Sequence, residues 1–324
     1  MIANVAIAIA AGAASALMYA LGARAPLSLV LSCLAPLPLM VAALGWGPLS
    51  AAIGGVAAAS FFALLLGMPA AILYAISIGL PAWWLGHLAL LGRAVPNATS
   101  AGNGAAPPAS IVEWYPPGRL LLWIAIIVTG LAFVSLLTIS FDGDAITGAF
   151  RRSFLLAVRI FAERGIAIDE GMADKMAAIA PAAAAPIPLV ILTINLWLAG
   201  KIALTSGRLN RPWPDLNTTA LPPMTLVALC VALAFCFTGG IVAIFAKVLA
   251  GALLMAYALT GLAVLHTLTS GSVNRVMWLV ISYGSIVMLI GWPLLIAALL
   301  GAADALFGFR DRFTRTRPPP LPAA

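Results

Sequence analysis

Long apolar stretches separated by short polar breaks run through the chain up to about position 303. A transmembrane helix needs roughly 20 predominantly apolar residues at a rise of about 1.5 Å each, and most of the stretches reach that length. Cutting the chain at its breaks predicts spans at 3–22, 27–45, 49–67, 70–91, 119–140, 179–200, 224–246 and 248–268. A ninth stretch, Val276–Ala303, contains Pro293 and is either one kinked span or a broken pair of helices.

The composition agrees with this pattern. Of the 324 residues, 63% are hydrophobic and 8% are charged, and the mean hydropathy is +1.10. A soluble domain carries about 25% charged residues, so a soluble enzyme, a disordered chain and a coiled coil are excluded. We therefore predict an all-α, polytopic integral membrane helix bundle, with about 8 to 9 transmembrane helices and an amphipathic surface helix, in contact with the lipid bilayer.

The breaks also suggest a domain organisation. Very short turns between the first four spans force antiparallel neighbours, which predicts a four-helix membrane unit at 1–91 whose first helix is retained rather than cleaved as a signal peptide. Segment 92–118 is rich in Asn, Gly and Pro and is expected to be a flexible linker. A second membrane unit follows at 119–303, and 304–324 is expected to be a basic tail.

An insertion at 141–178 interrupts the second unit with a charged but periodic pattern. Phe150, Phe154, Val158 and Phe161 share one helical face, while arginines and a glutamate occupy the other, so an amphipathic helix is predicted. Asp142 and Asp144 are interpreted as the turn that caps it. Met172, Met176 and Ile179 suggest a second short helix, whose charged residues would face outward: Asp169, Glu170, Asp174 and Lys175. The insertion would either lie on the bilayer or cap the bundle, or act as a gate over a cavity.

The net charge of +7 does not indicate nucleic-acid binding, because the basic residues lie between apolar segments. Counting Lys and Arg on alternate sides of the predicted spans gives six against seven, so the positive-inside rule does not assign an orientation. The three cysteines lie in apolar stretches without a metal-ligand pattern.

The predicted spans contain almost no ionisable residues. All ten acids are placed in loops, the insertion or the tail, and Lys247 at a turn between two spans. A carrier coupled to protons or ions usually holds such a group at bilayer depth, so intrinsic ion coupling is not expected. His87 and His266 lack partners for a metal site, and no catalytic motif is present. We expect no enzyme activity, no cofactor and no metal.

Two features suggest contacts with other molecules. Pro36 and Pro38 break the second span, and unwound backbone at membrane depth must face protein or a cavity. We expect a ligand cavity there with Trp83 and Trp84; kinked packing without a ligand is the alternative. Ala8, Gly12 and Ala16 form a small-residue stripe on the first span, which serves either packing within the chain or docking of another membrane subunit.

Four short segments resemble the YybS-like bacterial membrane proteins, a family of unknown function: Ala35–Pro38, Asn195–Lys201, Gly261–His266 and Leu299–Arg310. The N-terminal part of that family is similar to the substrate-binding subunits of energy-coupling-factor vitamin transporters. Their first helix docks on a shared transmembrane subunit through small residues, and the resemblance assigns that role to Ala8, Gly12 and Ala16. This is a likeness of fold, which does not establish function.

The sequence thus predicts a multi-pass protein of the bacterial inner membrane that binds an unidentified small molecule or assists transport. The alternative is a membrane scaffold that recruits partners through the surface helix and the basic tail.

Overall fold

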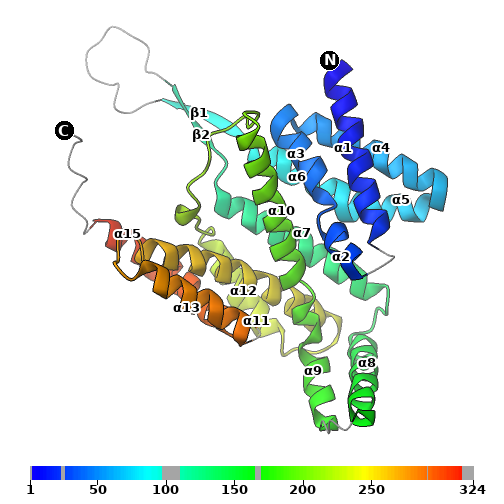
Figure 1. The fold of residues 1–324 in the computed structure, drawn as a ribbon. Coiled ribbons are helices and arrows are strands. Elements are labelled where there is room, and N and C mark those ends of the chain that lie inside the picture. Colours follow the sequence, from blue (N-terminus) through cyan, green and yellow to red (C-terminus); the bar gives the residue numbers. More distant parts are fainter. Residues whose placement is uncertain (1, 23–25, 97–109, 165–168, 290, 316–324) are drawn as a thin grey trace. The chain divides into compact units, whose positions relative to one another are not determined.

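A computed structural model describes residues 2–22, 26–96, 110–164, 169–289 and 291–315 of the chain (Figure 1). Apart from one two-stranded ribbon, the elements of these described ranges are helices, which confirms the all-α class. The sequence expected a linker where the ribbon lies: β1 (Gly92–Pro96) pairs antiparallel with β2 (Ser110–Trp114). The rest of that expected linker up to β2, residues 97–109, lies outside the described ranges.

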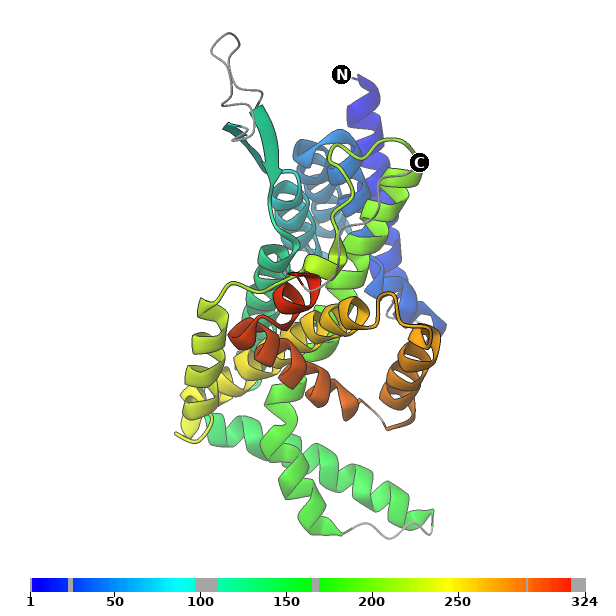
Figure 2. The same ribbon diagram turned by 90° about the vertical axis from the view of Figure 1, so that its left-hand side faces the viewer.

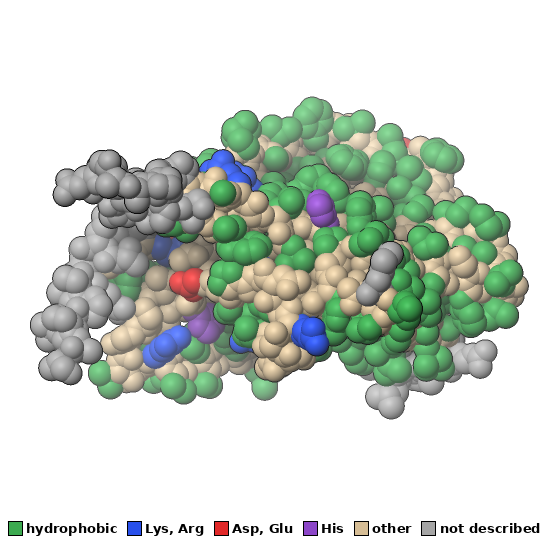
Figure 3. Space-filling view, turned by 90° about the horizontal axis from the view of Figure 1, so that it is seen from above, with side chains coloured by type: hydrophobic (Ala, Val, Ile, Leu, Met, Phe, Trp, Pro, Cys, Tyr) green, Lys and Arg blue, Asp and Glu red, His purple; other side chains and the backbone are tan. Residues whose placement is uncertain are grey.

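Seven helices of the described chain are long and apolar enough to cross a membrane. Large apolar side chains lie on their surfaces: Val56 is 67% exposed and Leu64 87% exposed. Figure 3 shows one face of the molecule on which hydrophobic side chains are abundant and charged ones few. Apolar surface of this extent is stable in lipid and not in water, so the chain is a multi-pass membrane protein.

The helix ends of the N-terminal part follow the predicted turns. α3 (Pro36–Trp46) and α4 (Pro48–Leu66) are separated by Gly47, and α4 and α5 (Met68–Tyr74) by Gly67. Gly47 has φ of 96° and Gly67 has φ of 88°. Only glycine adopts such φ values without strain. Pro48 follows Gly47 directly, Pro69 lies two residues after Gly67, and a proline is tolerated in the first turn of a helix.

The chain forms two compact units. The first comprises Met1–Leu120 and Ile191–Pro214, so that the C-terminal part of α10 (Pro186–Thr205) belongs with the N-terminal helices. In this unit α1 (Ile2–Leu21) packs against α4, and α3 packs against α6 (Leu80–Ala89). A π-helical turn, Ala75–Gly79, joins α5 to α6 just before Pro81, whose ring does not fit a regular helix interior.

Glycine allows the close approach of α1 and α4, which lie side by side in Figure 1. A Cβ atom on Gly12 would be 2.2 Å from the carbonyl oxygen of Gly54, and one on Gly54 would be 2.5 Å from that of Ala8. Ala8 is fully buried and Ala16 is 3% exposed. Ala8 and Gly12 therefore pack against α4, and Ala16, one turn further along α1, is buried as well.

The second unit comprises Leu121–Val190 and Asp215–Ala324. Its central helix is α12 (Gly240–Leu268), which packs against α14 (Pro293–Phe307), α11 (Met224–Phe235) and α9 (Glu170–Ala183). Glycines again permit the contact: a Cβ on Gly261 would be 1.8 Å from the carbonyl oxygen of Ala297. This unit also contains most of α7 (Pro117–Leu137).

Two predicted boundaries in this unit were wrong. The turn expected at Lys247 does not exist, because α12 runs through it, and the chain turns instead at Gly239, whose φ is 86°. Of the two alternatives left open for Val276–Ala303, the structure has the broken pair, α13 (Arg275–Met288) and α14. The boundary expected at 304 was also wrong, because α14 extends to Phe307 and α15 (Phe309–Arg315) follows it. Gly308, with φ of 62°, ends α14 in the left-handed conformation.

The insertion forms a helical hairpin of α8 (Gly143–Glu163) and α9, seen in Figure 2. As predicted, Asp142 caps α8, its side chain accepting a hydrogen bond from the amide of Asp144 at 3.2 Å. The predicted second helix is α9, and its larger apolar side chains lie on the surface. Met172, Met176 and Ile179 are exposed, whereas Ala173 and Ala177 are each 1% exposed, because small side chains let the helices come closer.

The Gly12 contact gives a stability prediction. Gly12→Leu places a side chain against the backbone of α4, and we expect it to lower the free energy of unfolding by at least about 1–3 kcal/mol, the usual cost of overpacking. Thermal unfolding of the purified protein in detergent measures the effect. Gly130→Leu is the control, since beyond the nearby backbone of its own helix no described atom lies within 4 Å of a Cβ on Gly130. Equal melting temperatures for the two variants would contradict the contact.

Candidate functional site

The second predicted span is interrupted where Pro36 and Pro38 indicate. α2 (Pro26–Cys33) ends three residues before α3 begins at Pro36. Side chains of other helices bond to the backbone at the interruption. The hydroxyl of Ser15 on α1 donates to the carbonyl oxygen of Ala35 at 2.6 Å, and the amide of Asn195 on α10 donates to that of Cys33 at 2.8 Å. Two carbonyl groups at the break thus accept hydrogen bonds from neighbouring helices, which a membrane interior favours.

Ser15 also connects the interruption to α5. Its oxygen lies 2.6 Å from the hydroxyl oxygen of Tyr74, and both residues are fully buried. Because the Ser15 hydroxyl already donates to Ala35, it accepts this second hydrogen bond from Tyr74. The Tyr74 ring in turn packs on Phe62 of α4, with 5.0 Å between ring centroids. One buried chain of contacts therefore links α1, the interruption, α4 and α5.

Asn195 has one polar atom that this packing leaves unused. The residue is 1% exposed, and its side-chain NH₂ donates to Cys33 and to the carbonyl oxygen of Ile191, both at 2.8 Å. Both amide protons are thereby committed, which fixes the orientation of the group. Its carbonyl oxygen Oδ1 is buried and has no hydrogen-bond partner among the described residues. The interruption therefore presents a buried acceptor to any donor that reaches it.

Beyond the interruption, α1, α3 and α10 enclose an open groove of about 400 Å³. All of its lining side chains are apolar: Ile7, Ala10, Ala11, Leu37, Pro38, Val41, Ala42, Trp46 and Ile202. The groove shares helices with the polar contacts. Ile202 lies seven residues after Asn195, and hence on the same face of α10, while Ala11 lies one turn before Ser15 on α1.

Of the residues expected to form a cavity, Pro38 lines this groove. Pro36 is buried at the start of α3. Trp83 and Trp84 are half-buried on α6 and pack on His87, with the Trp83 and His87 rings stacked at a centroid distance of 6.1 Å. Neither tryptophan lines the groove. Of the predicted set, the groove thus includes Pro38 alone, and its other walls come from α1 and from α10, which is far away in sequence.

Cations stacked on aromatic rings surround one end of the first unit. Lys201 Nζ lies 4.2 Å from the ring centroid of Trp213, and the guanidinium of Arg208 lies 5.7 Å from that of Trp46. Arg211 donates to the carbonyl oxygens of Ala89 at 2.7 Å and Tyr115 at 3.4 Å, and burial lowers its pKa. Cation–aromatic pairs of this kind are typical of the membrane–water interface, so this end marks an interface.

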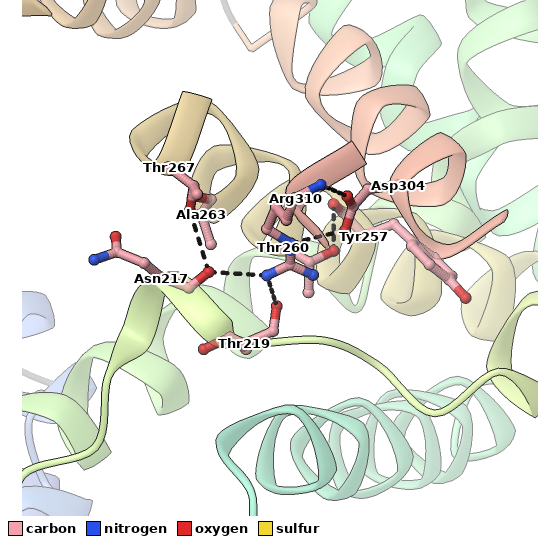
Figure 4. A network of polar contacts seen from close by, with 8 residues as sticks. All are labelled: Asn217, Thr219, Tyr257, Thr260, Ala263, Thr267, Asp304 and Arg310. Atoms are coloured by element: carbon pink, nitrogen blue, oxygen red, sulfur yellow. Dashed lines mark hydrogen bonds and ion pairs between the residues drawn. The ribbon is translucent and has the colours of Figure 1, made fainter. Parts of the chain in front are cut away.

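The second unit holds a buried ion pair that the sequence analysis missed. Asp304, expected in the tail, lies within α14, and the Nε atom of Arg310 is 2.8 Å from its carboxylate. The side chains of Arg310 and Asp304 are only 13% and 5% exposed. Arg310 also donates to the carbonyl oxygens of Asn217 and Thr219, each at 2.9 Å (Figure 4). The sequence did contain a signal for this pair: Asp304 ends an apolar stretch and stands six positions before Arg310.

The carboxylate of Asp304 is fully hydrogen-bonded within the protein. Asp304 accepts a second hydrogen bond, at 2.9 Å, from the backbone amide of Arg310, so both carboxylate oxygens are used. The pair thus joins α15 to α14 and to the loop at 217–219. We interpret it as a structural clamp, since both carboxylate oxygens already hold protein donors.

Among the described residues, no group of three or more His, Cys, Asp or Glu side chains is placed to hold a metal ion. Comparison with known protein families, with curated proteins and with solved structures finds no match for the chain.

The role of Asn195 can be tested by Asn195→Leu, which removes the donor to Cys33 while keeping a similar volume. A buried carbonyl without its donor costs about 1–3 kcal/mol, so the melting temperature in detergent should fall. Asn210→Leu, at an exposed loop position, is the matched control. An unchanged melting temperature for Asn195→Leu would refute a stabilising role of this hydrogen bond.

The clamp is tested by Arg310→Met. It leaves Asp304 buried without its cation, and breaking such a pair costs about 3–5 kcal/mol. Arg93→Met breaks the Arg93–Glu113 pair, whose side chains are 77% and 53% exposed, and should cost at most about 1 kcal/mol. Unfolding titrations of the two variants measure the contrast; equal losses would show that burial does not strengthen the Arg310–Asp304 interaction.

Proposed function

We propose that this membrane protein binds a small, largely apolar molecule in the groove between α1, α3 and α10, without catalysis and without intrinsic ion coupling. The observation that carries the proposal is the groove itself: it has the volume of a ligand site, about 400 Å³, within the range of roughly 300–1,000 Å³ typical of such sites. It also lies beside an interrupted helix, the kind of backbone that membrane proteins use at binding sites.

The chemistry of the lining supports an apolar ligand. Each side chain that forms the wall is aliphatic or aromatic, so the wall provides dispersion contacts and no charge. The resemblance to YybS-like proteins, and through them to transporter subunits that bind vitamins, agrees with ligand binding and with a location in the bacterial inner membrane.

The alternative is a scaffold that recruits partners. The observation in its favour is the exposed apolar side chains of α9, where Met172 is 50% exposed and Ile179 is 56% exposed. The basic tail supports it less than the sequence suggested, because Arg310 is engaged in the clamp. We therefore prefer the ligand-binding proposal.

Filling the groove tests the proposal. Ala10 lines it and is exposed, so Ala10→Phe should occupy the space without disturbing buried packing. Native mass spectrometry of the purified protein should show a bound small molecule whose occupancy falls at least tenfold in the variant. Ala13→Phe, at an exposed α1 position outside the groove, is the control and should keep the ligand. Equal occupancy in both variants would favour the scaffold.

A further inference from the structure

The charge of the first unit is unbalanced. Its sequence contains six basic residues, Arg24, Arg93, Arg119, Lys201, Arg208 and Arg211, and one acidic residue, Glu113. Glu113 forms an ion pair with Arg93, with 2.7 Å between Arg93 Nη2 and Glu113 Oε2. The other cations of the unit therefore have no carboxylate of their own unit left to pair with. Such an excess near a membrane interface favours anionic partners.

Arg208 is the cation that lies at the groove. Its guanidinium stacks on the ring of Trp46, and Trp46 is part of the groove wall. A Cβ atom on the neighbouring Gly45 would be 3.5 Å from Arg208 Cβ. Arg211, by comparison, is held by two backbone carbonyls, whereas the described structure gives the exposed guanidinium of Arg208 the Trp46 ring and no oxygen partner.

The direction of the groove matches that of a lipid. Trp46 is the last residue of α3, at the end marked by the cation–aromatic pairs, and Pro38 lies eight residues deeper in the same helix. At 1.5 Å per residue, this spans about 12 Å from the interface toward the membrane interior. A phospholipid in a leaflet has the same order: a charged headgroup at the interface and an apolar chain directed inward.

We propose that Arg208 and the groove form one site for an anionic phospholipid, with the headgroup phosphate at Arg208 and one acyl chain between α1, α3 and α10. The inference rests on the proposed function and names its ligand class. A guanidinium suits this role because its planar fork binds two phosphate oxygens together, and its stacking on Trp46 orients it before the lipid arrives. The apolar wall accounts for the chain and Arg208 for the preference for negative charge.

The full-length protein is purified and exchanged into micelles that contain equal amounts of dioleoylphosphatidylglycerol and dioleoylphosphatidylcholine, and bound lipids are counted by native mass spectrometry. We expect one retained phosphatidylglycerol in preference to phosphatidylcholine. Arg208→Gln should reduce that preference roughly tenfold, the effect of losing one charge-assisted interaction. Arg119→Gln is the matched control, since Arg119 is exposed and also stacks on a ring, that of Tyr115, which does not line the groove.

The outcomes separate this inference from the proposed function. Loss of the preference in Arg208→Gln but not in Arg119→Gln, with loss of retention in Ala10→Phe, supports the site. Equal effects of the two arginine variants overturn it, because the preference then reflects net charge alone. If lipid retention depends on Ala10 but not on Arg208, the groove still binds an apolar ligand, and the placement of the headgroup phosphate at Arg208 is overturned. If lipid retention depends on Arg208 but not on Ala10, both the phospholipid site and the proposed ligand-binding function of the groove are overturned.

Discussion

The need to satisfy every backbone polar group inside a hydrocarbon environment constrains this fold more than any other interaction. An intact helix meets the need by itself, but the second span does not remain intact, because two prolines remove donors within three positions. Ser15 and Asn195 supply donors to the carbonyls of Ala35 and Cys33. These hydrogen bonds join α1 and α10 to the break, and the groove lies between the same two helices and α3.

Close contact between backbones is the second principle, and both units use it. In the first unit the contact lies between Gly12 and Gly54, and in the second between Gly261 and the backbone of Ala297. Lipid is as apolar as the side chains, so burial of hydrophobic groups drives helix association weakly, and close packing of small residues takes its place. This explains why Ala8 and Gly12 of α1 pack against α4, its own neighbour, in the structure.

The two units differ in how their charged side chains are paired. The second unit pairs its buried charge internally: Asp304 and Arg310 neutralise each other, and the remaining hydrogen bonds of the pair go to backbone atoms. The first unit has one carboxylate for six basic residues and stacks several of its cations on tryptophan or tyrosine rings at one end. A pair that is closed internally stabilises a fold, whereas an exposed cation beside an apolar groove can also bind a ligand.

The sequence by itself determined the membrane class, most of the long helices, the turns at Gly47 and Gly67, the cap at Asp142 and the break at Pro36, because each depends on local composition or on the backbone chemistry of glycine and proline. It misplaced the turn near Lys247, since tertiary packing selects among helix boundaries that are locally similar. Only the tertiary structure showed that Ala8 and Gly12 pack against α4, that Asn195 reaches Cys33 across 162 positions, and that Arg208 stacks on Trp46 at the groove. Those contacts join residues distant in sequence, and the pattern of apolar positions along a helix does not specify which partner each face will meet.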